Sequence, residues 1–163
     1  MSRTPRTIGL ISDTHGLLRP EALNALKGSD LILHAGDVGN PEIIAALKSL
    51  APVFAVRGNV DTDPWAQQLP ETEVVETGPA TIYMLHDVHA LDLNPAAAGF
   101  HIVVSGHSHK HSGAERGGVL FLNPGSAGPR RFDLPVTVAR IRLDQDPWKI
   151  EFIDLFGEPA GMQ

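Results

Sequence analysis

Five short polar clusters carry the residues of this chain that could do chemistry. Each follows a short apolar run that reads as a β-strand, as Ile102–Ser105 does before the last cluster. Together they offer carboxylate and amide oxygens and imidazole nitrogens, which bind hard and borderline divalent metals. This layout at one edge of a sheet predicts a two-metal hydrolase. The clusters are Asp13-Thr14-His15, Gly36-Asp37, Gly58-Asn59, His86 and Gly106-His107-Ser108-His109.

The two aspartates are expected to lie side by side. Asp13 and His15 leave the first strand together, so both can reach one ion; an Asp capping a turn beside a surface His is the alternative. Asp37 ends the neighbouring strand, about 4.8 Å away. Two carboxylates that close repel each other unless a cation sits between them. Asp37 could therefore bridge two metals, although it could also cap a helix.

The remaining ligand candidates differ in how specific they are. His107-x-His109 after a buried strand is the most specific pattern, because neutral imidazole is a common metal ligand. Gly58-Asn59 alone also reads as a turn. His86 alone could be structural, and His89 competes with it as a ligand in that segment. Three further histidines are interpreted as structural or surface residues: His34, His101 and His111.

Length and composition favour one globular domain. The chain has 163 residues, 42% of them hydrophobic, so it can bury a core. We expect a single domain over residues 1–163, with its core at about 7–155 and a frayed tail at 157–163. There is no cysteine, no apolar run of membrane-spanning length and no signal-peptide core. The expected location is the cytoplasm, with no membrane partner.

The charge balance argues against nucleic acid as a partner. The formal net charge is −6 with histidine neutral, whereas nucleic-acid binders usually present a basic face. Arg130-Arg131 is the one basic concentration, and it reads either as a solvated loop or as a polyanion site.

The order of elements predicts two packed sheets flanked by helices. Strands Thr7–Ser12, Leu31–Ala35 and Val53–Val56 alternate with helices at Pro20–Leu26 and from Pro41, which implies parallel pairing. The fold class is therefore α/β (α+β by some schemes), a four-layer αββα sandwich of two mixed β-sheets. Later expected elements are strands 73–76, 80–85, 102–105, 114–116, 119–122, 136–143 and 149–154, and a short helix at 95–98.

The ordered clusters resemble the calcineurin-like metallophosphoesterase superfamily. Within it, the chain is similar to the small single-domain phosphodiesterases of bacteria and archaea. The resemblance spans about residues 7 to 127. It rests on the five clusters and on Ser12-Asp13-Thr14-His15-Gly16, Arg57-Gly58-Asn59-Val60-Asp61, Gly106-His107-Ser108-His109 and Asn123-Pro124-Gly125-Ser126.

The resemblance implies a role for each candidate. Asp13, His15 and His109 would hold one metal together with Asp37, which would bridge to the second. Asn59, His86 and His107 would complete the second metal, and Asn59 would also contact substrate phosphate. The nucleophile would be a metal-bridging hydroxide. The two divalent ions are expected to be Mn²⁺, with Ni²⁺, Fe and Zn²⁺ as alternatives. Asn123–Ser126 would form a loop near the site, or a plain Pro-Gly turn.

Two positions depart from the pattern of the superfamily. Many relatives carry a His after the Gly-Asn pair that assists catalysis near the leaving group; here that residue is Val60. We therefore expect modest rates, a preference for good leaving groups and no phosphoprotein phosphatase activity. His86 is usually followed by Gly, and here by Asp87, which could orient a ligating His or repel an anionic substrate.

The leading functional hypothesis is a phosphodiesterase for small phosphodiesters. A phosphomonoesterase or nucleotide pyrophosphatase on the same site is one alternative, and a protein-interaction scaffold of the retromer-subunit type is another. A nuclease is less favoured, because this short acidic chain has little room for a DNA-binding segment. Trp65 or Phe132 on the surface would point to a homo-oligomer.

Overall fold

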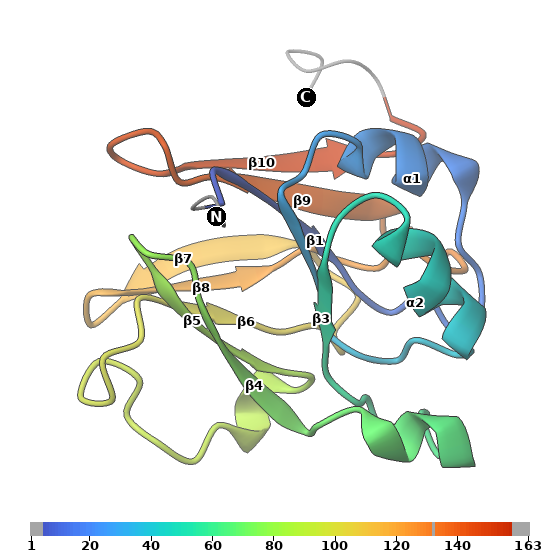
Figure 1. Cartoon of the computed structure of the whole chain (residues 1–163), viewed down its shortest axis with the longest axis horizontal. Helices are drawn as coiled ribbons and strands as arrows, with labels where there is room; N and C mark the ends of the chain where they lie inside the picture. Colours follow the sequence, from blue (N-terminus) through green and yellow to red (C-terminus); the bar gives the residue numbers. More distant parts are fainter. Residues whose placement is uncertain (1–4, 132, 158–163) are drawn as a thin grey trace.

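Two five-stranded sheets stack face to face in the computed structural model, which describes residues 5–131 and 133–157 (Figure 1). Phe132 and the expected frayed tail beyond Gly157 lie outside this range. The two mixed sheets and their helices confirm the expected α/β sandwich. In the described part of the chain, no helix is long and apolar enough to cross a bilayer.

The first sheet has the order β10-β9-β1-β2-β3. Its parallel part is the expected β-α-β-α-β unit, in which Pro41 opens the second helix and the side chain of Asn40 accepts a hydrogen bond from the Ile43 amide. Two antiparallel strands then extend it on the β1 side. Its elements are β1 (Thr7–Ile11), α1 (Pro20–Leu26), β2 (Leu31–His34), α2 (Pro41–Lys48), β3 (Val53–Ala55), β9 (Thr137–Arg142) and β10 (Lys149–Asp154).

The second sheet has the order β4-β5-β6-β8-β7. Hairpins at Gly78 and at Gly117-Gly118 join β4 to β5 and β7 to β8, as their turn residues indicate. Strands β5, β6 and β8 run parallel. Its strands are β4 (Thr72–Glu76), β5 (Thr81–Leu85), β6 (Ile102–Val104), β7 (Ser112–Arg116) and β8 (Val119–Asn123).

The outer faces of the two sheets are covered differently. The facing sides share one apolar core, which includes Leu10, Leu33 and Met84. Helices α1 and α2 pack on the outer side of the first sheet and close a second cluster around Leu26 and Leu47. The outer side of the second sheet is covered by loop residues between β5 and β6 instead. This loop contains the short 3₁₀ helix η2 (Val88–Ala90).

The prediction of a short helix at 95–98 is wrong. The segment forms hydrogen-bonded turns, in which the Ala98 amide bonds to the Asn94 carbonyl and the Phe100 amide to the Pro95 carbonyl. One turn is too short to repay the cost of helix nucleation, and Gly99, with φ of 86°, ends it. A 3₁₀ helix that the pattern did not predict, η1, lies at Pro64–Gln68 instead.

Candidate metal centre

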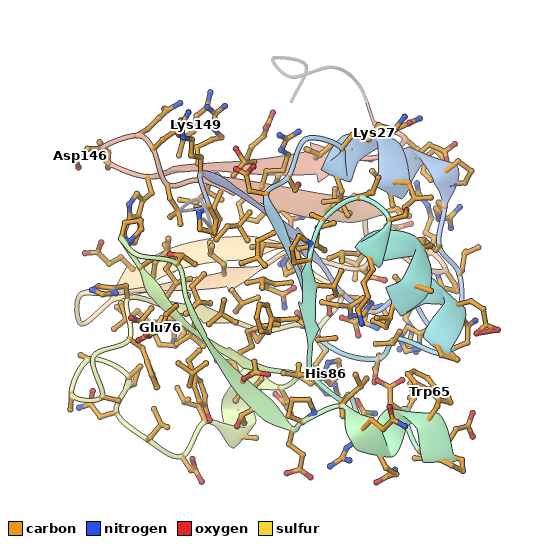
Figure 2. The ribbon with its side chains drawn as sticks, viewed as in Figure 1. Lys27, Trp65, Glu76, His86, Asp146 and Lys149 are labelled. Atoms are coloured by element: carbon orange, nitrogen blue, oxygen red, sulfur yellow. The ribbon has the colours of Figure 1, made fainter. Side chains whose placement is uncertain are left out.

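The five polar clusters meet where strands of both sheets end. Asp13 and Asp37 follow β1 and β2, while His86 and the 107–109 loop follow β5 and β6. In Figure 2, His86 lies on the same side of the view as the η1 turn that carries Trp65. The packing of two sheets therefore brings together residues that are 94 positions apart in sequence, such as His15 and His109.

The backbone of these clusters adopts an uncommon conformation. Among the described residues, the non-glycine residues with positive φ are Asp13 (56°), His15 (48°), Asp37 (56°), His107 (73°) and His109 (65°). All five are ligand candidates. Left-handed backbone costs free energy in non-glycine residues and tends to persist at functional sites, where the surrounding structure enforces it.

Asp13, His15 and His109 form a first group of ligands. Asp13 Oδ1 lies 3.7 Å from His15 Nε2 and 3.4 Å from His109 Nε2. The two imidazole nitrogens are 3.3 Å apart. These separations are close to those between ligands of one ion, since metal–nitrogen and metal–oxygen bonds are about 2.0–2.2 Å long.

Asp13, Asp37 and His86 form a second group. Asp37 Oδ2 lies 3.1 Å from His86 Nε2, and Asp13 Oδ1 lies 3.8 Å from the same nitrogen. Asp37 Oδ2 is also 3.6 Å from His15 Nε2, a member of the first group. Both carboxylates therefore face both groups, and the bridging role of Asp37 stays a prediction.

In each carboxylate, one oxygen accepts hydrogen bonds from the protein and the other faces the imidazoles. Asp13 Oδ2 accepts hydrogen bonds from Ser12 Oγ (2.6 Å) and from the His107 amide (3.0 Å). Asp37 Oδ1 accepts one from the Val60 amide (3.0 Å). The opposite oxygens, Asp13 Oδ1 and Asp37 Oδ2, are the ones that face the imidazoles.

The residues at this edge fit a divalent cation. Among the described residues, Asp13 Oδ1 and His86 Nε2 are buried and make no hydrogen bond, which is costly unless an ion satisfies them. His86 Nδ1 lies 2.7 Å from the Ala35 carbonyl and can donate to it, which directs the lone pair of Nε2 toward the aspartates. A ligating histidine is commonly oriented in this way.

The pKa values of these groups record their mutual attraction. Burial opposes ionisation of Asp37, but His86, the Val60 amide and His15 together lower its pKa to about 2. Asp13 raises the pKa of His15 against the effect of burial. Burial lowers the pKa of His86, yet Asp37 and the Ala35 carbonyl outweigh it and the net shift is upward. The pocket thus favours positive charge beside its two carboxylates.

Two glycines allow the strand ends to approach this closely. A Cβ on Gly58 would overlap Asp37, and a Cβ on Gly106 would overlap Ser12 Oγ and Asp13 Oδ2. These glycines precede Asn59 and His107 in the clusters, so their function is to bring the backbone against the carboxylates.

Asn59 and His107 lie at the border of the centre. His107 belongs to neither ligand group, although its ring meets that of His86 edge-on with centroids 5.2 Å apart. Both Asn59 and His107 line a cavity of about 380 Å³, together with His86 and Asp87. His89 is 90% exposed and contacts Asp87, so the structure brings His86, and not His89, to the carboxylates.

Two residues that support the centre were given no role by the sequence. Asp61 is buried and accepts hydrogen bonds from the amides of Val38, Gly39 and Gly58, which ties the loops after β2 and β3 together. Its position in the Gly58–Asp61 turn is the signal that could have found it. Ser12 holds Asp13, as described above.

Thr14 links this region to the fully buried His34. Its hydroxyl donates to the Val38 carbonyl and lies 3.0 Å from His34 Nε2. His34 Nδ1 accepts from the Gly36 amide, and burial lowers the pKa of His34 to about 4. His34 is therefore structural, as expected.

The other interpreted residues also have defined places. The Thr81 amide donates to His101 Nδ1, and His111 packs against Phe152. Asn123 donates from Nδ2 to the Gly106 carbonyl and to Ser108 Oγ, so the loop at Asn123–Ser126 does lie beside the centre. Trp65 is half-buried against the core beneath the helices.

Comparison with known sequences gives a consistent picture. Residues 7–146 match the family model described as "Calcineurin-like phosphoesterase superfamily domain". A probable metallophosphoesterase of Methanothermobacter thermautotrophicus is 36% identical over 147 residues, which cover 82% of this chain and 85% of that protein. A phosphodiesterase of Methanocaldococcus jannaschii is 26% identical over 137 residues, covering 72% and 82%.

Solved structures share the fold. A protein of Streptococcus pneumoniae described as a predicted phosphoesterase superposes with a TM-score of 0.77 at 28% identity, covering 98% of this chain and 96% of that one. Vps29 of Entamoeba histolytica, solved in complex with Zn²⁺, gives a TM-score of 0.68 at 27% identity, covering 91% and 99%.

Proposed function

The chain belongs to the calcineurin-like phosphoesterase superfamily and is a metallophosphoesterase, and we propose that it hydrolyses small phosphodiesters at a binuclear metal site. The observation that carries this proposal is the pair of ligand groups that share Asp13, with buried ligand atoms that no hydrogen bond satisfies. We propose Mn²⁺ as the physiological ion, with Ni²⁺, Fe and Zn²⁺ as alternatives that the same oxygen and nitrogen ligands accept.

The seven candidates divide the work of the proposed site. Bound divalent ions would supply a hydroxide nucleophile at neutral pH and offset phosphoryl charge. Asp13, His15 and His109 would hold one ion, and Asp37 would bridge to a second. His86, His107 and Asn59 would complete the second, since they line the cavity that opens on that side.

Substrate would bind in the 380 Å³ cavity. Asn59 is exposed on its wall, where its amide can donate to a phosphoryl oxygen. Burial lowers the pKa of His109 and Asp13 raises that of His15, and in both cases the exposed Arg131 makes a smaller contribution that disfavours protonation.

A substrate with a good leaving group suits this site better than a phosphoprotein does. Val60 is exposed and cannot transfer a proton to the leaving group. Turnover would therefore depend on a leaving group that departs without protonation. The similarity to the phosphodiesterase of Methanocaldococcus jannaschii named above supports the choice of a phosphodiester as substrate.

The decisive comparison uses bis(p-nitrophenyl) phosphate against p-nitrophenyl phosphate. Metal-stripped protein is refilled with Mn²⁺, Ni²⁺ or Zn²⁺, and Asp37→Asn and His107→Ala are assayed beside it. We expect metal-dependent diester turnover that falls at least 100-fold in both variants. A preference for the monoester would move the assignment to a phosphomonoesterase.

Metal binding alone would not separate an enzyme from a scaffold. Vps29 of Entamoeba histolytica was itself solved with Zn²⁺. A folded, metal-loaded protein without turnover on either ester would therefore favour the scaffold.

A further inference from the structure

Asp87 stands where two cavities meet beside the metal centre. The cavity of about 380 Å³ contains Asn59 and His86, and a smaller one of about 190 Å³ contains Arg116 and Phe121. Asp87 and His107 line both of them. A substrate whose phosphoryl group lies at His86 in the larger cavity shares that cavity with Asp87.

The Asp87 carboxylate is held in a fixed orientation. Its Oδ1 caps η2 by accepting a hydrogen bond from the His89 amide (3.0 Å), and it lies 3.2 Å from His89 Nδ1. Its Oδ2 accepts no hydrogen bond from the described residues and lies 3.9 Å from His107 Nε2, beyond hydrogen-bonding distance. One carboxylate oxygen of a residue that lines both cavities therefore has no hydrogen-bond donor among the described residues.

Besides His89 and His107, the charged side chains around Asp87 stand on the walls of the two cavities. Arg57, on the wall of the larger cavity, is paired with Glu71 at 3.0 Å. Asp92 adds a further negative group to that wall. Arg116 lines only the smaller cavity, where its guanidinium lies over the Phe121 ring.

We propose that Asp87 is a charge filter that selects singly charged phosphodiesters over doubly charged phosphomonoesters. This inference rests on the proposed function and names its substrate class. A monoester carries almost two negative charges above its second pKa of about 6, whereas a diester carries one. Repulsion by Asp87 therefore acts twice as strongly on the monoester. Where water screens the charges as in bulk, one extra unit charge about 4 Å away changes binding by about fivefold, and less complete screening makes the change larger.

The test replaces Asp87 by asparagine in the metal-loaded protein. Asp87→Asn keeps an oxygen for the His89 amide, so the cap of η2 is retained while the charge is removed. The matched control is Glu151→Gln, which removes the same charge from exposed β10 on the edge of the other sheet. Circular dichroism and the metal content of each variant establish that the fold and the centre persist.

Binding is measured by calorimetry at pH 8 with methyl phosphate, a dianion, and dimethyl phosphate, a monoanion of nearly the same shape. We expect Asp87→Asn to tighten both, and to shift the ratio of the two Kd values about five- to tenfold in favour of the dianion. The shift should shrink at high salt, since screening weakens the repulsion. Glu151→Gln should leave the ratio unchanged.

The kinetic measurement compares kcat/KM for bis(p-nitrophenyl) phosphate with kcat/KM for p-nitrophenyl phosphate, in the wild type and in both variants. The ratio of these two values keeps the charge filter and the phosphodiesterase assignment distinguishable. Diester turnover in the wild type with a ratio that Asp87→Asn does not move would overturn the filter and leave the phosphodiesterase assignment standing. Absence of turnover together with a shifted Kd ratio would support the filter and overturn the phosphodiesterase assignment. Equal losses of both activities with weaker metal binding would show that Asp87 positions His107, and would also overturn the filter.

Discussion

At the scale of single residues, the role of each carboxylate in the candidate metal centre depends on the groups that contact it. In Asp13 and in Asp37, one carboxylate oxygen accepts hydrogen bonds from the protein and the other faces the candidate ligands. That division follows from backbone turns at positive φ, which no residue type at these positions signals. The types of the candidate ligands could be predicted from sequence, because carboxylates, an amide and imidazoles follow the ends of the expected strands. Their orientation could not.

The buried His34 makes metal-free protein sensitive to acid. Its pKa of about 4 in the folded state lies below the unfolded value of 6.5, so the unfolded chain binds the proton more tightly. The stability it contributes is present above pH 6.5 and is lost as the pH falls toward 4. Between pH 7.5 and 5 we expect a loss of about 2 kcal/mol from this residue.

Urea unfolding of His34→Gln measures that contribution. The two tryptophans report the transition by fluorescence. The variant should be less stable at pH 7.5 but lose about 2 kcal/mol less than the wild type on acidification. Parallel stability curves for the two proteins would show that His34 does not titrate in this window.

Loops between the elements, rather than the strands, set the precision of the centre. The strands were predictable from short apolar runs, and the parallel start followed from the alternation of strands with Pro-initiated helices. The turns at 95–98 and the η1 helix could not be predicted, because they depend on tertiary contacts rather than on periodicity.

Asp61 joins the loops after β2 and β3 through three backbone amides. Replacement by asparagine would turn an NH₂ group toward amide donors and remove the charge. We expect Asp61→Asn to lower the free energy of unfolding by about 2–4 kcal/mol, measured in urea. Asp63→Asn, two residues on and exposed without a side-chain cap bond, is the control. Equal stability of the two variants would contradict the role of Asp61.

Asn123 at the end of β8 holds the loop that carries His107 and His109. We expect Asn123→Ala to fold and to bind metal about 10- to 100-fold more weakly, as loss of an outer support of a ligand commonly does. Calorimetric titration of metal-free protein gives the affinity. Asn94→Ala removes a hydrogen bond to the Ala97 amide in the 86–101 segment and should not change it. An unchanged affinity in Asn123→Ala would mean that the loop holds its shape unaided.

The whole molecule brings ligands from both sheets to one edge, so metal binding and folding are coupled. An ion that binds only the folded state adds about 2.7 kcal/mol at 100 times its Kd. For a chain of this size that corresponds to a rise in Tm of about 5–10 °C. Calorimetry of protein with added Mn²⁺ or chelator should show this shift, and Asp13→Asn should abolish most of it. A Tm indifferent to metal would contradict a shared site.

The two-sheet architecture could be predicted from element order, and the structure confirms it. The covering of the outer face of the second sheet could not be predicted, because the 86–101 segment has no helical periodicity. In the structure, Leu91 and Phe100 of this segment pack on that face. The same segment carries Asp87, and its place between two cavities emerges only when β5, β7 and β8 are packed together.

The number of ions that activity requires tests the binuclear phosphodiesterase most directly. Metal-free protein is titrated with Mn²⁺, and bis(p-nitrophenyl) phosphate turnover is plotted against the metal bound per chain, measured by equilibrium dialysis. We expect little turnover below one ion and saturation at two, since Asp13 and Asp37 face both ligand groups. Saturation at one ion, or two bound ions without turnover, would contradict the proposal.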